Sequence, residues 1–119
     1  MAKPPRTARI TLGIAFDPDV VLGPGKASLL EGIKQTGSIS AAGRLMSVSY
    51  KSAWDLTDAI NGCFVEPVVL TSKGGVGGGG ASLTPFGEEL LVAYRRMEAQ
   101  SIQAIQPELV WLQGKLRKK

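Results

Sequence analysis

The chain has 119 residues, of which 44% are hydrophobic and 20% charged, and a formal net charge of +4. This size is typical of one globular domain and excludes a multidomain enzyme, because domains average roughly 100 to 150 residues. The sequence contains no histidine and one cysteine, Cys63, which excludes a Ser-His-Asp triad, an imidazole zinc site and an internal disulfide. We therefore predict no enzyme activity, no catalytic or metal-binding residue and no cofactor.

No apolar run approaches the roughly 18 to 20 residues that cross a bilayer, and the first residues lack the pattern of an export signal. These features and the single cysteine predict a cytoplasmic protein with no membrane contact. The net charge equals that of four cations near the C-terminus, Lys115, Arg117, Lys118 and Lys119, so it says little about partners. A prediction of nucleic-acid binding must rest on local motifs.

The first residues predict a flexible arm, residues 1–6, followed by a strand, residues 7–16. Apolar side chains stand at every second position of this strand, which is the period of a strand with one buried face. Asp17-Pro18-Asp19 predicts the turn that ends it.

Three helices are predicted within residues 26–62. The first ends before Gly37, a residue suited to a left-handed C-cap. Ser38 and Ser49 are placed to cap two further helices, and Gly62 ends the second of these. A tight turn joins the two helices, and alanines in the first permit close approach, which is typical of a helix-turn-helix.

Residues 67–84 predict a β-hairpin whose long flexible tip holds the glycine tract between Gly74 and Gly80. The segment Gly75–Gly80 formally matches the dinucleotide-binding pattern G-x-G-x-x-G, but a strand follows where that motif requires a helix. Two interpretations stay open. Either the tip lies close to a phosphate or in a narrow groove, or it has no partner.

Residues 85–116 predict a long helix and a shorter one. Thr84-Pro85 is a helix start, the apolar rhythm continues to about Ile105, and Pro107 separates it from a final amphipathic piece. These helices carry more apolar residues than a short domain needs, which predicts a homodimer through helix 85–105 and the C-terminal helix. The alternative is that the last helix folds back on its own domain.

The order of these elements predicts an α+β, mainly α fold. It corresponds to a single winged helix-turn-helix domain over residues 1–119, with a glycine-rich β-hairpin as the wing and a long C-terminal dimerisation helix.

The predicted third helix carries the sharpest functional signal. Its apolar side centres on Ala53, and Lys51 and Asp55 lie on the opposite side. The first turn offers donors for phosphates and base edges, and Asp55 is an acceptor for cytosine, whereas Asp58 repels phosphates. For Trp54, packing is favoured over base contact.

The predicted DNA-binding residues lie on the helix-turn-helix and on the wing. Arg44 and Lys73 are predicted to contact the phosphate backbone. The alternative is that both side chains are simply solvated. The full set is Ser38, Ser40, Arg44, Ser49, Tyr50, Lys51, Ser52, Asp55, Lys73, Gly74 and Gly75.

The chain combines Gly37-Ser38-Ile39-Ser40-Ala41-Ala42, Ser49-Tyr50-Lys51-Ser52-Ala53-Trp54, Asn61, Phe64, Pro67, the glycine tract, Leu83-Thr84-x-x-Gly87 and Leu90-Leu91-x-x-Tyr94-Arg95. Over roughly residues 8 to 100, these blocks resemble the N-terminal DNA-binding domain of ModE-type molybdate-responsive transcriptional regulators. The first block alone also resembles LysR-type regulators. The resemblance implies a bacterial, dimeric winged helix that binds operator DNA.

The chain departs from that family in two ways. Full-length members carry C-terminal molybdate-binding domains, for which this chain has no room, so the resemblance implies a regulator that lacks them. Gly43 stands where the DNA-binding pattern often has alanine, which costs the helix about 0.5 to 1 kcal/mol unless the glycine serves packing. Two other functions stay open: a winged-helix protein-interaction module without DNA binding, and a small oxyanion-responsive regulator.

Overall fold

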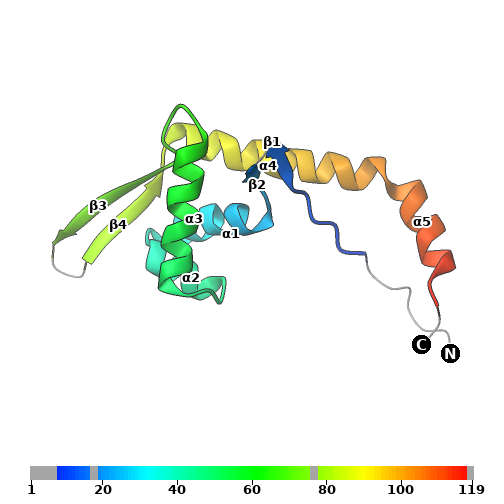
Figure 1. The fold of residues 1–119 in the computed structure, drawn as a ribbon, viewed down its shortest axis with the longest axis horizontal. Coiled ribbons are helices and arrows are strands. Elements are labelled where there is room, and N and C mark those ends of the chain that lie inside the picture. Colours follow the sequence, from blue (N-terminus) through cyan, green and yellow to red (C-terminus); the bar gives the residue numbers. More distant parts are fainter. Residues whose placement is uncertain (1–7, 17–18, 76–77, 118–119) are drawn as a thin grey trace.

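The structure, a computed structural model, describes residues 8–16, 19–75 and 78–117. These residues form five helices and two antiparallel hairpins, so the fold is α+β and mainly helical, as predicted (Figure 1). In chain order the elements are β1 (Ile14–Phe16), β2 (Asp19–Leu22), α1 (Pro24–Thr36), α2 (Ile39–Leu45), α3 (Tyr50–Cys63), β3 (Val69–Gly75), β4 (Gly78–Leu83), α4 (Pro85–Ala104) and α5 (Gln106–Lys115). The predicted arm, Thr7 and the Asp17-Pro18 part of the predicted turn lie outside the described residues.

The ends of several helices follow from the capping residues that the sequence predicted. Ser38 caps α2 and Ser49 caps α3, each accepting a hydrogen bond from the backbone N–H three residues later, at 3.1 and 3.0 Å. Thr84 caps α4 in the same way at 2.9 Å. Gly37 ends α1 with a φ of 72°. Each of these contacts satisfies a terminal backbone group that the helix itself leaves without a partner.

Helices α1, α2 and α3 pack around one core because glycines let their backbones approach closely. A Cβ on Gly32 of α1 would lie 2.8 Å from the Cβ of Ala42 in α2. One on Gly43 of α2 would lie 3.0 Å from the Cβ of Ala53 in α3. Gly43 therefore serves packing. The largest fully buried side chains among the described residues are Leu29, Leu30, Ile33, Thr57, Ile60, Val68 and Tyr94.

The N-terminal segment differs from the strand predicted over residues 7–16. Its alternation is present, since Ile10, Leu12 and Ile14 are partly buried and the residues between them are exposed. Only the last part forms a strand, β1, because among the described residues this is the part that meets a pairing partner, β2. Strand β2 was not predicted, although the apolar run Val20-Val21-Leu22 after a turn is a strand signal.

The hairpin β3–β4 has longer strands than predicted. β3 continues to Gly75 and β4 begins at Gly78, so most of the glycine tract lies in paired strands. The ladder pairs Val69 with Leu83 at its base, and its register is irregular between Ser72 and Gly75. Backbone pairing across the hairpin overrides the low strand propensity of glycine, which local reasoning cannot anticipate.

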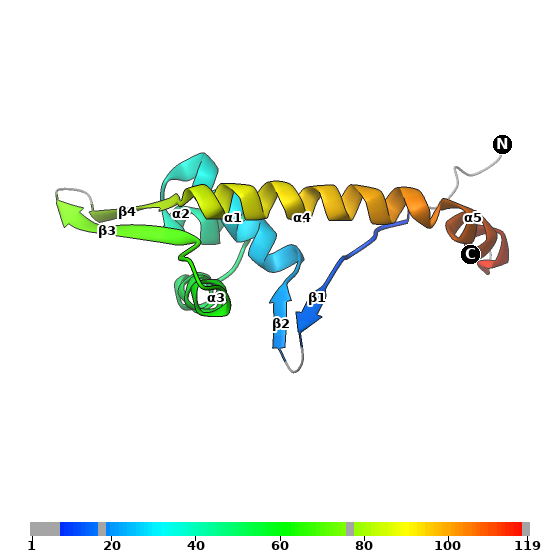
Figure 2. The ribbon, with the colours of Figure 1, turned by 90° about the horizontal axis from the view of Figure 1, so that it is seen from above.

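Helices α4 and α5 extend beyond the core on the side opposite the hairpin β3–β4 (Figure 2). α4 ends at Ala104 and α5 begins at Gln106, close to the predicted break, and α5, which the structure describes in full, has no buried residue. The Cα radius of gyration is 17.7 Å, against roughly 13 to 14 Å for a compact domain of this length. The last helix therefore does not fold back on the core.

Candidate nucleic-acid interface

The first two turns of α3 form an exposed polar face. Tyr50 is 64% exposed, and the side chains of Lys51 and Asp55 are 85% and 62% exposed. On the other side of the helix, Ala53 and Thr57 are buried in the core. The predicted assignment of a buried and an exposed side to this helix is confirmed. A rigid, core-backed helix thus presents its polar residues to the solvent.

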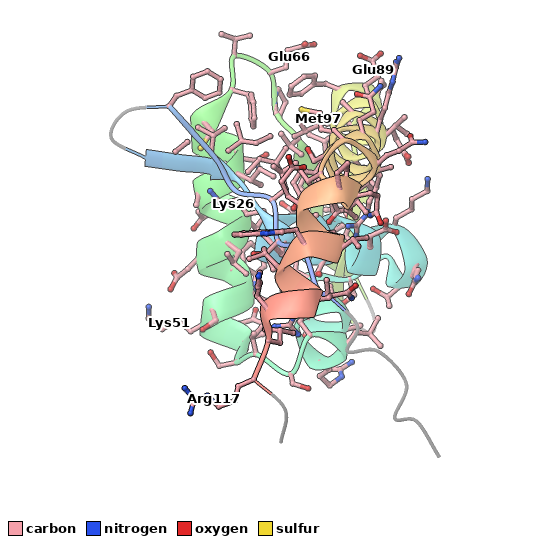
Figure 3. The ribbon with its side chains drawn as sticks, turned by 90° about the vertical axis from the view of Figure 1, so that its right-hand side faces the viewer. Lys26, Lys51, Glu66, Glu89, Met97 and Arg117 are labelled. Atoms are coloured by element: carbon pink, nitrogen blue, oxygen red, sulfur yellow. The ribbon has the colours of Figure 1, made fainter. Side chains whose placement is uncertain are left out.

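Lys51 and Asp55 interact across one turn of this face. Lys51 Nζ lies 2.8 Å from Asp55 Oδ2. The hydrogen bond that Lys51 donates to Asp55, followed by the charge of Asp55, raises the pKa of Lys51 above its ordinary value of 10.5. Because the pair is exposed, solvent weakens it and the ammonium group can exchange its partner at low cost. Figure 3 shows Lys51 projecting outward from α3.

Trp54 lies between the core and the exposed face of α3. It packs against the core cluster, as the sequence analysis favoured. The ring of Tyr50 contacts the ring of Trp54 with centroids 6.2 Å apart and planes inclined by 60°. Tilted aromatic contacts of this kind stabilise the position of both rings. Tyr50 is therefore held in place while most of its surface remains exposed.

The predicted serines have different roles. Ser38 and Ser49 use their side-chain oxygens to cap α2 and α3, and the Ser49 hydroxyl also donates to Ser52 Oγ at 3.0 Å. Ser40 and Arg44 lie on α2, where Ser40 is partly exposed and Arg44 is exposed. The structure therefore leaves Ser49, Tyr50, Lys51, Ser52 and Asp55 exposed on the first two turns of α3, and places Ser40 and Arg44 on the preceding helix.

The predicted wing residues Lys73, Gly74 and Gly75 lie in the outer part of β3. The hairpin extends from the end of the molecule that carries α3, while α5 lies at the opposite end (Figures 1 and 2). The base of the hairpin is tied to the turn between α1 and α2, because Ala81 N donates to Gly37 O at 2.8 Å. The hairpin is thus anchored to the same core as α1 and α2.

Asn61 is a residue whose role sequence reasoning missed. In the sequence, Asn61 is only one member of the ModE-type pattern, and no role follows from that. Its side chain joins the last turn of α3 to Val68 and Val69 at the base of the hairpin. The available signal was spacing: Asn61 continues the i, i+4 series of Ala53 and Thr57 on the inner side of the helix, where a polar group needs a partner.

Two further features are absent from the described part of the chain. No three His, Cys, Asp or Glu side chains gather there in a way that suits a metal ion. None of its helices combines the length and apolar character that crossing a membrane requires.

No protein-family model matches the chain, but individual proteins do. It is 50% identical over 78 residues to the molybdenum-pterin-binding protein MopB of Rhodobacter capsulatus, which covers 66% of the chain and 29% of that protein. It is 38% identical over 87 residues to the DNA-binding transcriptional dual regulator ModE of Escherichia coli K12, covering 73% of the chain and 33% of that protein. The chain is a relative of the ModE-type regulators.

A third relative extends the similarity along nearly the whole chain. The transcriptional regulator ModE of Haemophilus influenzae is 35% identical over 114 residues, covering 93% of the chain and 45% of that protein. The chain thus spans less than half the length of these relatives. The resemblance to ModE-type proteins is confirmed, and these relatives are bacterial proteins named as transcriptional regulators or as a molybdenum-pterin-binding protein. None of the three is named as an enzyme.

Proposed function

We propose that this ModE-type chain is a winged helix-turn-helix that binds operator DNA as a homodimer and so regulates transcription. In this proposal α3 is the recognition helix in the major groove and the hairpin β3–β4 is the wing. The observation that carries it is the exposed polar face on the first two turns of α3, capped by Ser49 and backed by the core.

Direct contacts to the DNA bases come from α3. Tyr50, Lys51 and Ser52 supply donors at the start of the helix, and Asp55 accepts from a cytosine amino group. Ser49 acts indirectly, because its side chain caps α3 and donates to Ser52 Oγ. Lys51 exchanges its pairing with Asp55 for the DNA, and its ammonium group carries its charge at neutral pH in either state.

Contacts to the phosphate backbone come from the elements beside α3. Ser40 and Arg44 act from α2, and Lys73 acts from the wing together with the backbone of Gly74 and Gly75. Ser38 has an indirect part, because its side chain is engaged in capping α2. These contacts set the position of the protein on the duplex and carry no base preference.

The second copy of the chain is proposed to pack on α4 and α5. α4 carries a shallow hollow lined partly by Val92, Ala93 and Met97, and Val92 is 65% exposed. α5 and the residue after it add a set of exposed large apolar side chains, Val110, Trp111, Leu112 and Leu116. Apolar surface concentrated in this way on two protruding helices is typical of a protein–protein interface.

Charges on α4 favour an antiparallel pairing of two copies. Glu89 and Arg96 flank Val92 and Ala93, and neither forms an ion pair with any residue that the structure describes. A two-fold axis between Val92 and Ala93 places Glu89 of each copy opposite Arg96 of the other. Glu89 and Lys51 project from opposite sides of the molecule in Figure 3, so dimerisation leaves the α3 face free.

Selection from a random duplex library tests the function. Purified protein is carried through several rounds at about 150 mM salt, which suppresses binding that depends only on counterion release. We expect a palindromic motif whose half-sites lie about one helical turn, or a multiple of it, apart. A Lys51→Ala variant should lose the motif or relax it at one position of each half-site.

A charge-matched control removes the effect of net charge. Lys115→Ala deletes one positive charge on α5, far from the α3 face, and should recover the wild-type motif. Recovery of no motif with the wild-type protein would overturn the proposal, and would leave the apolar α4–α5 surface as the functional one in a protein-interaction module.

A further inference from the structure

We propose that Asn61 is a positioning residue, which locks the wing at a set angle to the recognition helix so that both reach the DNA together. This inference rests on the proposed function. It concerns how the two DNA-contacting elements are coupled, which neither the fold nor the relatives assign.

The side-chain amide of Asn61 forms hydrogen bonds with the backbone at the start of β3, in the way that a neighbouring strand would. Oδ1 accepts from Val68 N at 2.8 Å and from Val69 N at 3.0 Å, and Nδ2 donates to Val69 O at 3.0 Å. The two valines are almost completely buried, with 0% and 3% exposure. Buried backbone groups without a partner are costly, so these bonds hold the start of β3 against the end of α3.

The carbonyl side of the Val68–Val69 peptide unit is held by the residues that begin α4. Val68 O accepts from Thr84 N at 3.0 Å, and Thr84 Oγ1 donates to Pro67 O at 2.7 Å. A Cβ on Gly87 would lie 3.2 Å from the carbonyl carbon of Val68 and closer still to its oxygen. The base of the wing is therefore fixed between α3 and α4, with Asn61 as the connection on the α3 side.

This geometry has a functional consequence. α3 and the wing are separate elements, and the loop that joins them, residues 64–68, has no regular secondary structure. With Asn61 in place, the wing contacts the phosphates when α3 enters the groove. The hairpin then loses no further conformational entropy on binding. Without it, the wing contact must be made by a hairpin held less firmly, and its contribution to binding is lost.

Amide hydrogen exchange on the free protein tests the connection itself. In Asn61→Ala, we expect faster exchange at Val68 and Val69 and along β3, with unchanged exchange at the buried Thr57 of α3. Asn61→Asp keeps both acceptor bonds but sets a carboxylate oxygen against Val69 O, so it should restore only part of the protection. Asp58→Ala, an exposed change on the same helix, is the matched control. Unchanged exchange at β3 in Asn61→Ala would overturn the inference.

A double-mutant cycle with Lys73→Ala tests the effect on DNA binding. In the wild-type background, Lys73→Ala should weaken binding and reduce the slope of log K against log salt by about one. In the Asn61→Ala background the same change should alter affinity less than about twofold, since the wing contact is already lost. In the Asn61→Asp background, which keeps the two acceptor bonds, Lys73→Ala should have a larger effect than in the Asn61→Ala background. A merely destabilising role for Asn61 does not produce this coupling.

The outcomes separate the two proposals. Equal effects of Lys73→Ala in all three backgrounds, with specific binding by the wild-type protein, overturn the positioning role and leave the proposed function intact. A wild-type Lys73→Ala without effect shows that there is no wing contact to position, and also overturns it. Absence of a selected motif with the wild-type protein overturns the proposed function, and the inference falls with it.

Discussion

Lys51 and Asp55 form an ion pair with 2.8 Å between Nζ and Oδ2 on the exposed face of α3. The cation proposed to contact DNA is therefore already engaged by a carboxylate in the free protein. DNA must compete with Asp55 for Lys51, and sites that offer Asp55 a donor, such as a cytosine amino group, lose less in the exchange.

Removing the Asp55 carboxylate should raise the affinity for DNA of any sequence and lower the specificity for the selected motif. In Asp55→Asn, Lys51 is released and one negative charge is lost, so affinity for random duplex should rise by about three- to tenfold with a steeper salt dependence. Discrimination between the selected motif and random DNA should fall. Fluorescence anisotropy against both duplexes measures the ratio, and Asp58→Asn provides the same charge change one turn away. A larger discrimination ratio in Asp55→Asn would contradict the role given to the pair.

Gly87 should tolerate no side chain. Because a Cβ there collides with the backbone carbonyl of Val68, Gly87→Ala should lower the free energy of unfolding by about 2 to 3 kcal/mol. Gly62→Ala is the control, since nothing lies within 4 Å of its Cβ position inside α3, and it should raise stability by about 0.5 to 1 kcal/mol. Urea denaturation measures both. Equal effects would show that the contact at Gly87 is relieved by a backbone shift.

Ser47 occupies a strained backbone conformation between α2 and α3. Its φ is 58°, in the left-handed region, which costs most residues roughly 1 to 2 kcal/mol and glycine little. Ser47→Gly should therefore raise the free energy of unfolding, by up to about 1 kcal/mol. Ser40→Gly, within α2, should lower it by about 0.5 kcal/mol. Thermal melts of the two variants should shift in opposite directions, and shifts of the same sign would refute this reading of the turn.

Tyr94 should make stability sensitive to alkaline pH. Its hydroxyl donates to Leu12 O at 2.8 Å, and burial, followed by the charge of Glu98, raises its pKa above the ordinary value of 10.0 against the opposing charge of Arg95. The neutral phenol is thus favoured in the folded state, so its contribution is complete below the ordinary pKa and is lost as the pH rises through the raised one.

Tyr94→Phe measures that contribution. The free energy of unfolding of the variant should be lower by about 1 to 2 kcal/mol at neutral pH, because Leu12 O loses its hydrogen-bond donor. Its stability should then fall less between neutral and alkaline pH than that of the wild-type protein. A residual fall is expected from Lys51, whose pKa is also raised. Parallel curves of unfolding free energy against pH would show that Tyr94 does not titrate with folding.

Charge reversal on α4 tests the proposed dimer. Glu89→Arg places like charges opposite each other at both ends of the antiparallel pair, and Arg96→Glu does the same. Each should raise the dimer dissociation constant by about tenfold or more. The double variant restores opposite charges and should return within about threefold of the wild-type value. Sedimentation velocity measures the dimer, and failure of the double variant to recover would refute this register.

Much of the helical structure follows from local signals in the sequence. Ser38, Ser49 and Thr84 cap the helices that they were expected to cap, because the interaction involves a backbone N–H only three residues away. The exposed face of α3 likewise follows from the period of the helix. Gly62 was expected to end α3, whereas the helix continues to Cys63, since a glycine with free space around it is tolerated in the last turn.

The sequence by itself determined where helices start and which side of each is apolar, since both depend on neighbours within one or two turns. Only the tertiary structure decided which residues meet across the fold. Tyr94 reaches Leu12, which is 82 residues away along the chain, and Asn61 reaches a strand rather than its own helix. The glycine tract pairs as strands, and residues 8–13 form none, because a strand exists only where a partner supplies its hydrogen bonds.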